Sequence, residues 1–122
     1  RYAVKSVIVP KLTDIQKRFV YANEADVLNV ALFGMTAKEW RDNNKGLAEE
    51  GNIRDYTDLL HLVILSNLEN INAELIKLKI PQNERLIKLN DAARTQMEIL
   101  KNNKSFNNLK YIENNIRKEI EG

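Results

Sequence analysis

Apolar residues in the second half of the chain recur at the spacing of an α-helix. From Thr57 onward they follow one another at steps of three and four residues, so they share one helix face. This seam consists of Leu60, Ile64, Leu68, Ile71, Leu75 and Leu78. Further apolar residues between 59 and 65 make the first half of the helix apolar on nearly every side, which is typical of a central, buried helix. We therefore expect Leu68 to be fully buried.

Pro81 separates this helix from a second one, because proline ends a helix and is favoured in the first turn of the next. The apolar residues that follow repeat at the same steps. They are Leu86, Leu89, Ala93, Met97 and Leu100. Two such seams joined by a short turn predict an antiparallel helical hairpin. Ser105 is positioned to cap a last helix, whose narrow apolar stripe consists of Phe106, Leu109, Ile112, Ile116 and Ile120.

Capping signals divide the first half of the chain into short helices. Thr13 with Gln16, and Thr36 with Glu39, are capping boxes, in which two side chains satisfy the free N–H groups of a helix start. The first of these helices should extend to about Ala22.

The segments between these helices also carry signals. Asn23 is positioned to cap a helix that Gly34 ends, because glycine adopts the left-handed conformation of a helix stop. Residues 2–10 are rich in β-branched side chains and end at Pro10, so they predict an extended arm or a short strand. Residues 43–51 predict a polar loop.

Together these patterns predict an all-α fold, a small helical bundle with a long antiparallel hairpin and a short N-terminal part that resembles a helix-turn-helix. Only four glycines and two prolines occur in 122 residues, which favours helices over the many turns of a β-sandwich. We expect a single domain over residues 1–122, with short helices and a loop in 1–56 and long helices in 57–122.

Composition narrows the possible functions. The absence of cysteine excludes disulfides and thiolate chemistry and favours a cytoplasmic location. No apolar run approaches the roughly 18 residues of a membrane span, and no signal peptide is present. The sequence begins at Arg1 without methionine, so we expect a trimmed form or a piece of a longer protein.

Residues that could support catalysis are sparse. His61 is the only histidine, and Asp58 lies one helical turn before it, a spacing that suits a metal. A stable metal site needs three or four ligands, and no second cluster exists, so we interpret His61 as a core residue. No glycine-rich phosphate loop and no serine in a nucleophile-elbow context occur. We expect no enzymatic activity, no cofactor and no metal.

One stretch, Asp26 to Asn43, predicts helix, glycine turn and short helix. In a helix-turn-helix the second helix enters the major groove of DNA. Val30 and Phe33 before the turn, with Met35 and Trp40 after it, would form the buried side. The outward residues would be Thr36, Lys38, Glu39 and Arg41.

Three of these outward residues are suited to DNA. Lys38 and Arg41 could contact phosphates or guanine edges, and Thr36 could donate to a phosphate. Glu39 and Asp42 on the same short helix repel phosphate. The alternative is a pair of packed helices with a glycine stop, which any α-domain can contain.

A second candidate lies in the sequence GNIRDY, residues 51–56. Arg54, beside Asp55 and Tyr56, could stack on a base or bind a phosphate. The alternative is a loop anchor, in which Arg54 binds the polar loop and Tyr56 packs under the long helix.

Charge is unevenly distributed although the net charge is only +2. Residues 1–20 contain five Lys or Arg and one Asp, a net charge of +4, whereas residues 21–60 contain four basic and eight acidic residues, a net charge of −4. The basic segment could bind a phosphate backbone, or it could pair with the acidic segment of the same chain.

The sequences ALFGMTAKEWR, GNIRDY and LSNLENINAELIKLKIPQNERLIKLNDAARTQM resemble a helical region of phage- and prophage-derived bacterial proteins that carry a KilA-N DNA-binding domain. The resemblance covers roughly residues 2–100. In that family the region follows the KilA-N module, which does not itself occur here. The resemblance implies a bacterial, mobile-element-linked protein concerned with DNA or regulation, and it assigns no DNA contact to this segment.

We therefore expect a non-enzymatic helical domain that organises or dimerises a DNA-associated protein, with auxiliary contact to duplex DNA. Its apolar helices favour a homodimer, because the long helix has more apolar surface than one hairpin partner can cover. The rival interpretation is a protein–protein interaction module with no role at DNA.

Overall fold

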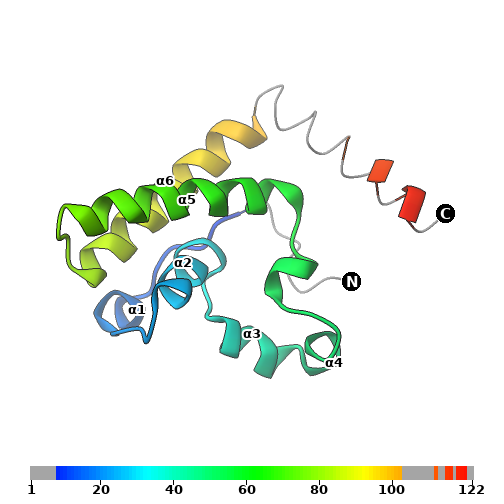
Figure 1. The fold of residues 1–122 in the computed structure, drawn as a ribbon, viewed down its shortest axis with the longest axis horizontal. Coiled ribbons are helices and arrows are strands. Elements are labelled where there is room, and N and C mark those ends of the chain that lie inside the picture. Colours follow the sequence, from blue (N-terminus) through cyan, green and yellow to red (C-terminus); the bar gives the residue numbers. More distant parts are fainter. Residues whose placement is uncertain (1–7, 103–111, 113–114, 117, 121–122) are drawn as a thin grey trace.

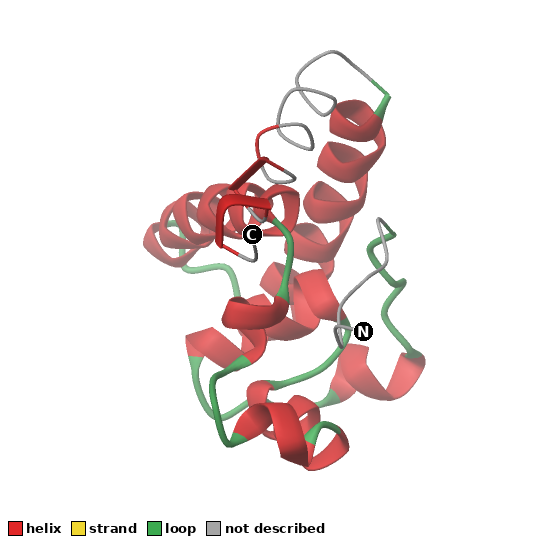
Figure 2. Cartoon of the chain, turned by 90° about the vertical axis from the view of Figure 1, so that its right-hand side faces the viewer, coloured by secondary structure: helices red, strands yellow, loops and turns green. Residues whose placement is uncertain are grey.

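The computed structural model describes residues 8–102, 112, 115–116 and 118–120. Every regular element in these residues is a helix, which confirms the all-α fold class (Figures 1 and 2). The predicted strand over residues 2–10 is absent from residues 8–10, and residues 1–7 lie outside the described part of the chain.

The first helix, α1 (Asp14–Arg18), starts at the predicted capping box of Thr13 and Gln16. It is shorter than expected from the sequence. Phe19 has an extended backbone, with φ −73° and ψ 141°, and ends α1 before Ala22. None of the residues of α1 is buried, so no packing against the core extends this helix.

The second helix, α2 (Glu24–Phe33), is capped by Asn23 as predicted. It ends at Gly34, whose φ of 75° is left-handed and therefore favours glycine. A β-carbon at this position would lie 3.1 Å from Cγ of Pro10, so the glycine also makes room for the chain before α1. We call residues 8–13 the arm.

Two short helices and a 3₁₀ helix follow. They are α3 (Ala37–Asn43), α4 (Lys45–Ala48) and η1 (Ile53–Tyr56). The sequence predicted only a polar loop where α4 lies. Leu47 and Ala48 are half-buried against the hydrophobic core, which gives this polar segment an apolar side that the prediction did not weigh.

The long helices α5 (Leu59–Lys77) and α6 (Gln82–Lys101) fold back on each other as the predicted antiparallel hairpin (Figure 1). Asp58 caps α5. At the other end Lys79 has a left-handed φ of 60°, and the N–H groups of Lys79 and Ile80 donate to the carbonyls of Ile76 and Leu75. This is a Schellman motif.

The core lies where α2 packs against both long helices. Leu68 has no exposed surface, as predicted. The buried residues of the two seams are Leu60, Ile64, Leu68, Leu86, Leu89, Ala93 and Met97. Leu78, which the pattern placed in the first seam, is 69% exposed because α5 has already ended before it.

A ring of polar side chains joins the three core helices. Arg85 Nη2 lies 2.8 Å from Glu24 Oε2, and Asn72 Nδ2 donates to Glu24 Oε1 at 2.9 Å. Arg85 Nε closes the ring on Asn72 Oδ1 at 3.2 Å. Arg85 and Asn72 are buried, whereas the Glu24 side chain is 46% exposed. The ring fixes α2 against α5 and α6.

The predicted last helix, with its cap at Ser105, lies largely outside the described residues. Within it, the structure describes helical positions that include Ile112, Ile116 and Ile120. In the described part of the chain, no helix combines the length and the apolar character needed to cross a membrane.

Candidate nucleic-acid interface

The predicted helix, glycine turn and short helix are present as α2, Gly34 and α3. Val30, Phe33 and Trp40 are buried beneath the turn, as expected, and Met35 is half-buried. Instead of lying mainly on α2, α3 packs on α4 and η1. The outer side of α3 is free of other described elements, because the residues from Lys38 to Asn43 are exposed except for Trp40.

The start of α3 is fixed by its capping box. Thr36 Oγ1 accepts a hydrogen bond from Glu39 N at 3.1 Å, and Glu39 Oε1 accepts one from Thr36 N at 2.8 Å. The hydroxyl of Thr36 keeps its proton for a further acceptor, such as a phosphate oxygen. The Glu39 carboxylate acts on its surroundings as well, because burial and then the charges of Glu39 and Asp26 raise the pKa of Tyr21.

Lys38 is not a free cation. Its Nζ lies 3.0 Å from Asp42 Oδ2, with both side chains mostly exposed. The hydrogen bond from Lys38, and then the charge of Lys38, lower the pKa of Asp42. Over α3 as a whole the charges of Lys38 and Arg41 are balanced by those of Glu39 and Asp42.

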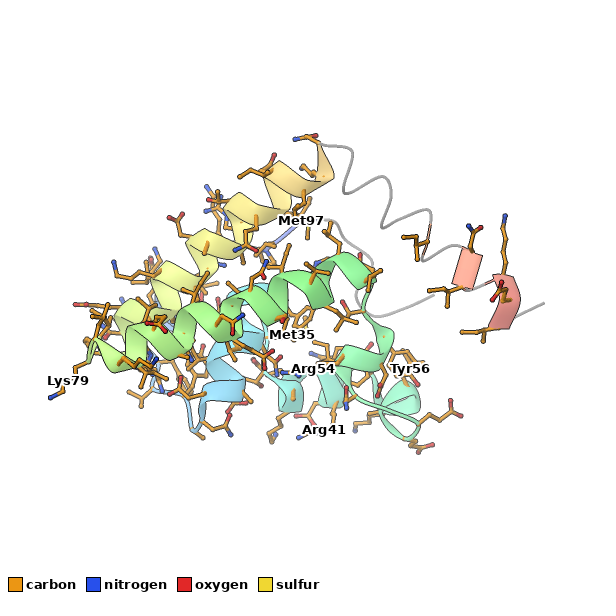
Figure 3. All side chains as sticks on the ribbon, turned by 45° about the horizontal axis from the view of Figure 1, so that its top comes forward. Met35, Arg41, Arg54, Tyr56, Lys79 and Met97 are labelled. Atoms are coloured by element: carbon orange, nitrogen blue, oxygen red, sulfur yellow. The ribbon has the colours of Figure 1, made fainter. Side chains whose placement is uncertain are left out.

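The two arginines of the predicted site are less constrained. Arg41 and Arg54 are exposed, and neither forms an ion pair with a residue that the structure describes. They belong to α3 and η1, which contact each other. Figure 3 shows both on the side of α5 away from Met97 of α6. The structure thus brings the predicted residues of α3 and η1 to one region of the molecule.

A stacked aromatic pair holds these two elements together. The rings of Trp40 and Tyr56 lie 5.7 Å apart at an angle of 24°. Arg54 itself is held only through its backbone N–H, which donates to Asn52 Oδ1 at 2.9 Å. The expected anchoring of the loop by the Arg54 side chain is therefore not seen, and Arg54 is exposed.

His61 is a core residue, as predicted. It is 1% exposed, its ring stacks on Phe33, and its Nδ1 lies 2.6 Å from Asp58 Oδ1. Asp58 Oδ1 also accepts the backbone N–H of His61. Within the described ranges, no group of three His, Asp or Glu side chains is arranged to hold a metal ion.

A second basic surface contains Lys11 and Lys17 of the basic segment 1–20, for which contact with a phosphate backbone was one of two expectations. The arm, α1 and α6 enclose a groove of about 380 Å³, and four cationic residues line it: Lys11, Lys17, Lys88 and Arg94. We call it the arm groove. The excess of basic residues in 1–20 was visible in the sequence. The contribution of α6 was not visible in the sequence, because Lys88 and Arg94 approach the arm only in the folded chain.

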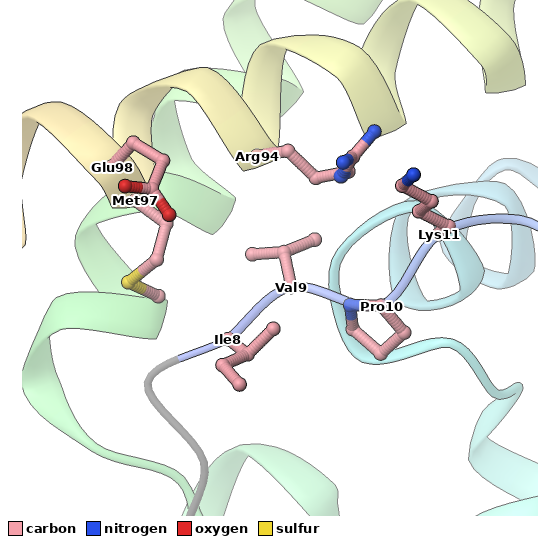
Figure 4. Close-up of a pocket in the computed structure, with 7 residues that line it drawn as sticks. All are labelled: Ile8, Val9, Pro10, Lys11, Arg94, Met97 and Glu98. Carbon is pink, nitrogen blue, oxygen red and sulfur yellow. The ribbon is translucent and has the colours of Figure 1, made fainter.

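A smaller pocket of about 220 Å³ adjoins it and shares Lys11 and Arg94 (Figure 4). Its other walls include Val9 and Pro10 of the arm and Met97 of α6. The two cations extend toward the same end of this pocket, one from the arm and one from α6.

Comparison of the chain with known protein families, with characterised proteins and with solved structures gives no match.

Proposed function

We propose that this chain is a non-catalytic, cytoplasmic helical domain of a DNA-associated protein of the KilA-N type, which it organises and dimerises, with auxiliary contact to duplex DNA through α3 and η1. The observation that carries the DNA contact is the exposure of Arg41 and Arg54, unpaired with described residues, on two adjacent elements. The buried ring of Trp40 anchors both elements, so the arginines project from a fixed base.

The four residues would play different roles. Arg41 and Arg54 would bind phosphate oxygens, which a planar guanidinium can contact with two N–H groups at once. Thr36 would donate its hydroxyl proton to a phosphate. Lys38 would have to exchange Asp42 for a phosphate. Because Glu39 and Asp42 oppose a polyanion, the contact at α3 is auxiliary rather than the main source of affinity.

The affinity for a duplex of arbitrary sequence, measured over a range of salt concentrations, tests the DNA contact. Substituting Lys38→Gln with Arg41→Gln should weaken binding and lower the slope of log affinity against log salt by about 1.8, the value for two phosphate contacts. The control variant Lys77→Gln with Lys79→Gln removes the same charge from exposed positions at the turn between α5 and α6. Equal affinity and slope in the wild type and the α3 variant would exclude α3 as a DNA contact.

Removing a single negative charge offers a further check on α3. Glu39→Gln should strengthen binding, since it removes a like-charge conflict with phosphate. The glutamine oxygen can still accept the N–H of Thr36, so the helix start should be retained.

The proposed self-association is supported by apolar side chains on the described part of the C-terminal segment. Ile112, Ile116 and Ile120 are spaced by four residues and are 47%, 49% and 78% exposed. A second copy that covers this stripe would remove it from water. Sedimentation at micromolar concentration checks this, because a clean monomer of 14.1 kDa would exclude the dimer.

The rival function, a protein-interaction module without a role at DNA, also has a specific observation in its favour. Ile15, Phe19 and Val20 are 72%, 55% and 82% exposed at and just after α1. Exposed apolar side chains grouped in this way are typical of a partner-binding surface. Absence of any salt-dependent binding to duplex DNA would favour this function over the first.

A further inference from the structure

We propose that the arm groove binds consecutive phosphate groups of a nucleic-acid backbone. The groove shares no residue with α3 or η1, so it is a second site. Its excess of cations over carboxylates makes it the stronger of the two. That its occupant is duplex DNA rests on the proposed function. That it binds a chain of phosphates follows from its own charge and shape.

Few carboxylates accompany the cations of the groove in the described part of the chain: Asp91 lines the groove, and Glu98 lines the adjoining pocket. Lys11, Lys17, Lys88 and Arg94 line it, and Asp91 is the one acidic residue in its lining, which leaves four positive charges against one negative. None of the four cations forms an ion pair with a described residue. On α3, by contrast, Lys38 forms an ion pair with Asp42.

A concave surface with an excess of one charge attracts ions of the other sign, because the low-dielectric walls focus the field into the groove. Like charges brought together by folding also repel each other, and a bound polyanion relieves that repulsion. The groove is therefore suited to a ligand with several negative charges rather than to a neutral one.

The spacing of the cations favours several phosphates over one. Lys88 and Arg94 are six residues apart on α6, which corresponds to about 9 Å along the helix axis. Lys11 and Lys17 line the same groove from the arm and from α1. Cations this far apart would contact successive phosphates of a chain. Ile87 and Leu12, also in the lining, would contact the less polar sugars between them.

The walls of the groove are held in place before any ligand binds. Asn90, at the base of the groove, donates from Nδ2 to the Pro10 carbonyl at 2.8 Å and to the Ala31 carbonyl at 2.9 Å. Gln16 of α1 donates to the Gly34 carbonyl at 3.0 Å. Val9 of the arm is buried. A preformed site loses less conformational freedom on binding than a flexible one.

The test compares two double variants with the same change in charge. The groove variant, Lys11→Gln with Lys88→Gln, alters exposed side chains only, so folding should be retained and can be checked by circular dichroism. The α3 variant, Lys38→Gln with Arg41→Gln, is the matched control. Each is titrated with a labelled DNA duplex of arbitrary sequence and, separately, with linear inorganic polyphosphate.

We expect the groove variant to bind both probes more weakly and to lower the salt slope for the duplex by about 1.8. On polyphosphate the α3 variant should match the wild type. Asp91→Asn should strengthen binding of both probes, because it removes the carboxylate in the lining.

The other outcomes separate the groove from the proposed function. If the duplex binds the groove variant as tightly as the wild type, the proposal that the arm groove binds phosphates is overturned, whereas the proposed DNA function stands. If polyphosphate binds in a groove-dependent way and the duplex does not bind at all, the groove is supported and the DNA function is overturned. If neither probe binds the wild type at low salt, both are overturned.

Discussion

The Nδ2 atom of Asn90 in α6 lies 2.8 Å from the carbonyl oxygen of Pro10 and fixes the arm against α6. Its Nδ2 also donates to the carbonyl of Ala31 in α2, so one buried amide joins three segments of the chain. The wall of the arm groove depends on this side chain.

Replacing Asn90 with alanine should therefore destabilise the fold. The change leaves the carbonyl oxygens of Pro10 and Ala31 without this donor, and the free energy of unfolding should fall by about 1–3 kcal/mol. Urea denaturation measures the loss. Asn83→Ala is the control, because Asn83 is exposed on the same helix and should change stability by no more than about 0.5 kcal/mol. Equal effects of the two changes would show that Asn90 does not hold the arm.

Leu68 at the centre of α5 should be among the most costly apolar positions. It has no exposed surface, and Leu68→Ala should cost about 2–5 kcal/mol through lost burial and a residual cavity. Leu78→Ala, at a side chain that is 69% exposed, should have little effect. A loss below about 1 kcal/mol at Leu68 would mean that the seam faces solvent or a dissociable partner.

We expect replacement of Lys79 by glycine to stabilise the fold. Its φ of 60° is left-handed, and the steric cost of that conformation for a residue with a β-carbon is about 1–2 kcal/mol. Lys79→Gly should raise the free energy of unfolding by about 0.5–1 kcal/mol, after the greater freedom of glycine in the unfolded chain is subtracted. Ala73→Gly, at an exposed position inside α5, should instead lower it by about 1 kcal/mol. Thermal unfolding should show a higher melting temperature for the first variant and a lower one for the second.

The Lys38–Asp42 pair predicts a dependence on pH. The hydrogen bond and the charge of Lys38 lower the pKa of Asp42, so the pair stabilises α3 at pH values above the ordinary carboxyl range. This contribution is lost only as the pH falls through the lowered pKa, below about pH 4. Carboxyl ¹³C NMR should show Asp42 titrating below an ordinary aspartate. Lys38→Gln should raise the Asp42 titration midpoint, and an unchanged midpoint would mean that the pair does not form in solution.

The features that sequence reasoning predicted are the local ones. The capping boxes at Thr13 and Thr36, the cap at Asn23 and the stop at Gly34 each depend on residues within four positions of one another. The two apolar seams and the hairpin follow from periodicity over about twenty residues. These features depend on residues that are close in the sequence, so they could be predicted from it.

Contacts between distant residues could not be predicted in this way. The ring of Glu24, Asn72 and Arg85 joins side chains up to 61 positions apart, and no spacing rule brings them together. The arm groove has the same origin, since Lys11 meets Arg94 only through the packing of α1 and the arm on α6. The early end of α1 at Phe19 could not be predicted either, because it depends on whether the helix packs against the core. A helix without buried residues gains no packing energy from extension.

Amide NMR of the ¹⁵N-labelled chain, titrated with a short duplex at low salt, tests most directly whether the chain contacts duplex DNA through the surface cations of its helices. The largest shifts should lie in residues 11–17 and 87–94, with a smaller set in residues 36–42 and at Arg54, and all should reverse as salt is added. An unchanged spectrum, or salt-independent shifts confined to Ile15, Phe19 and Val20, would contradict the account and favour a protein-interaction module.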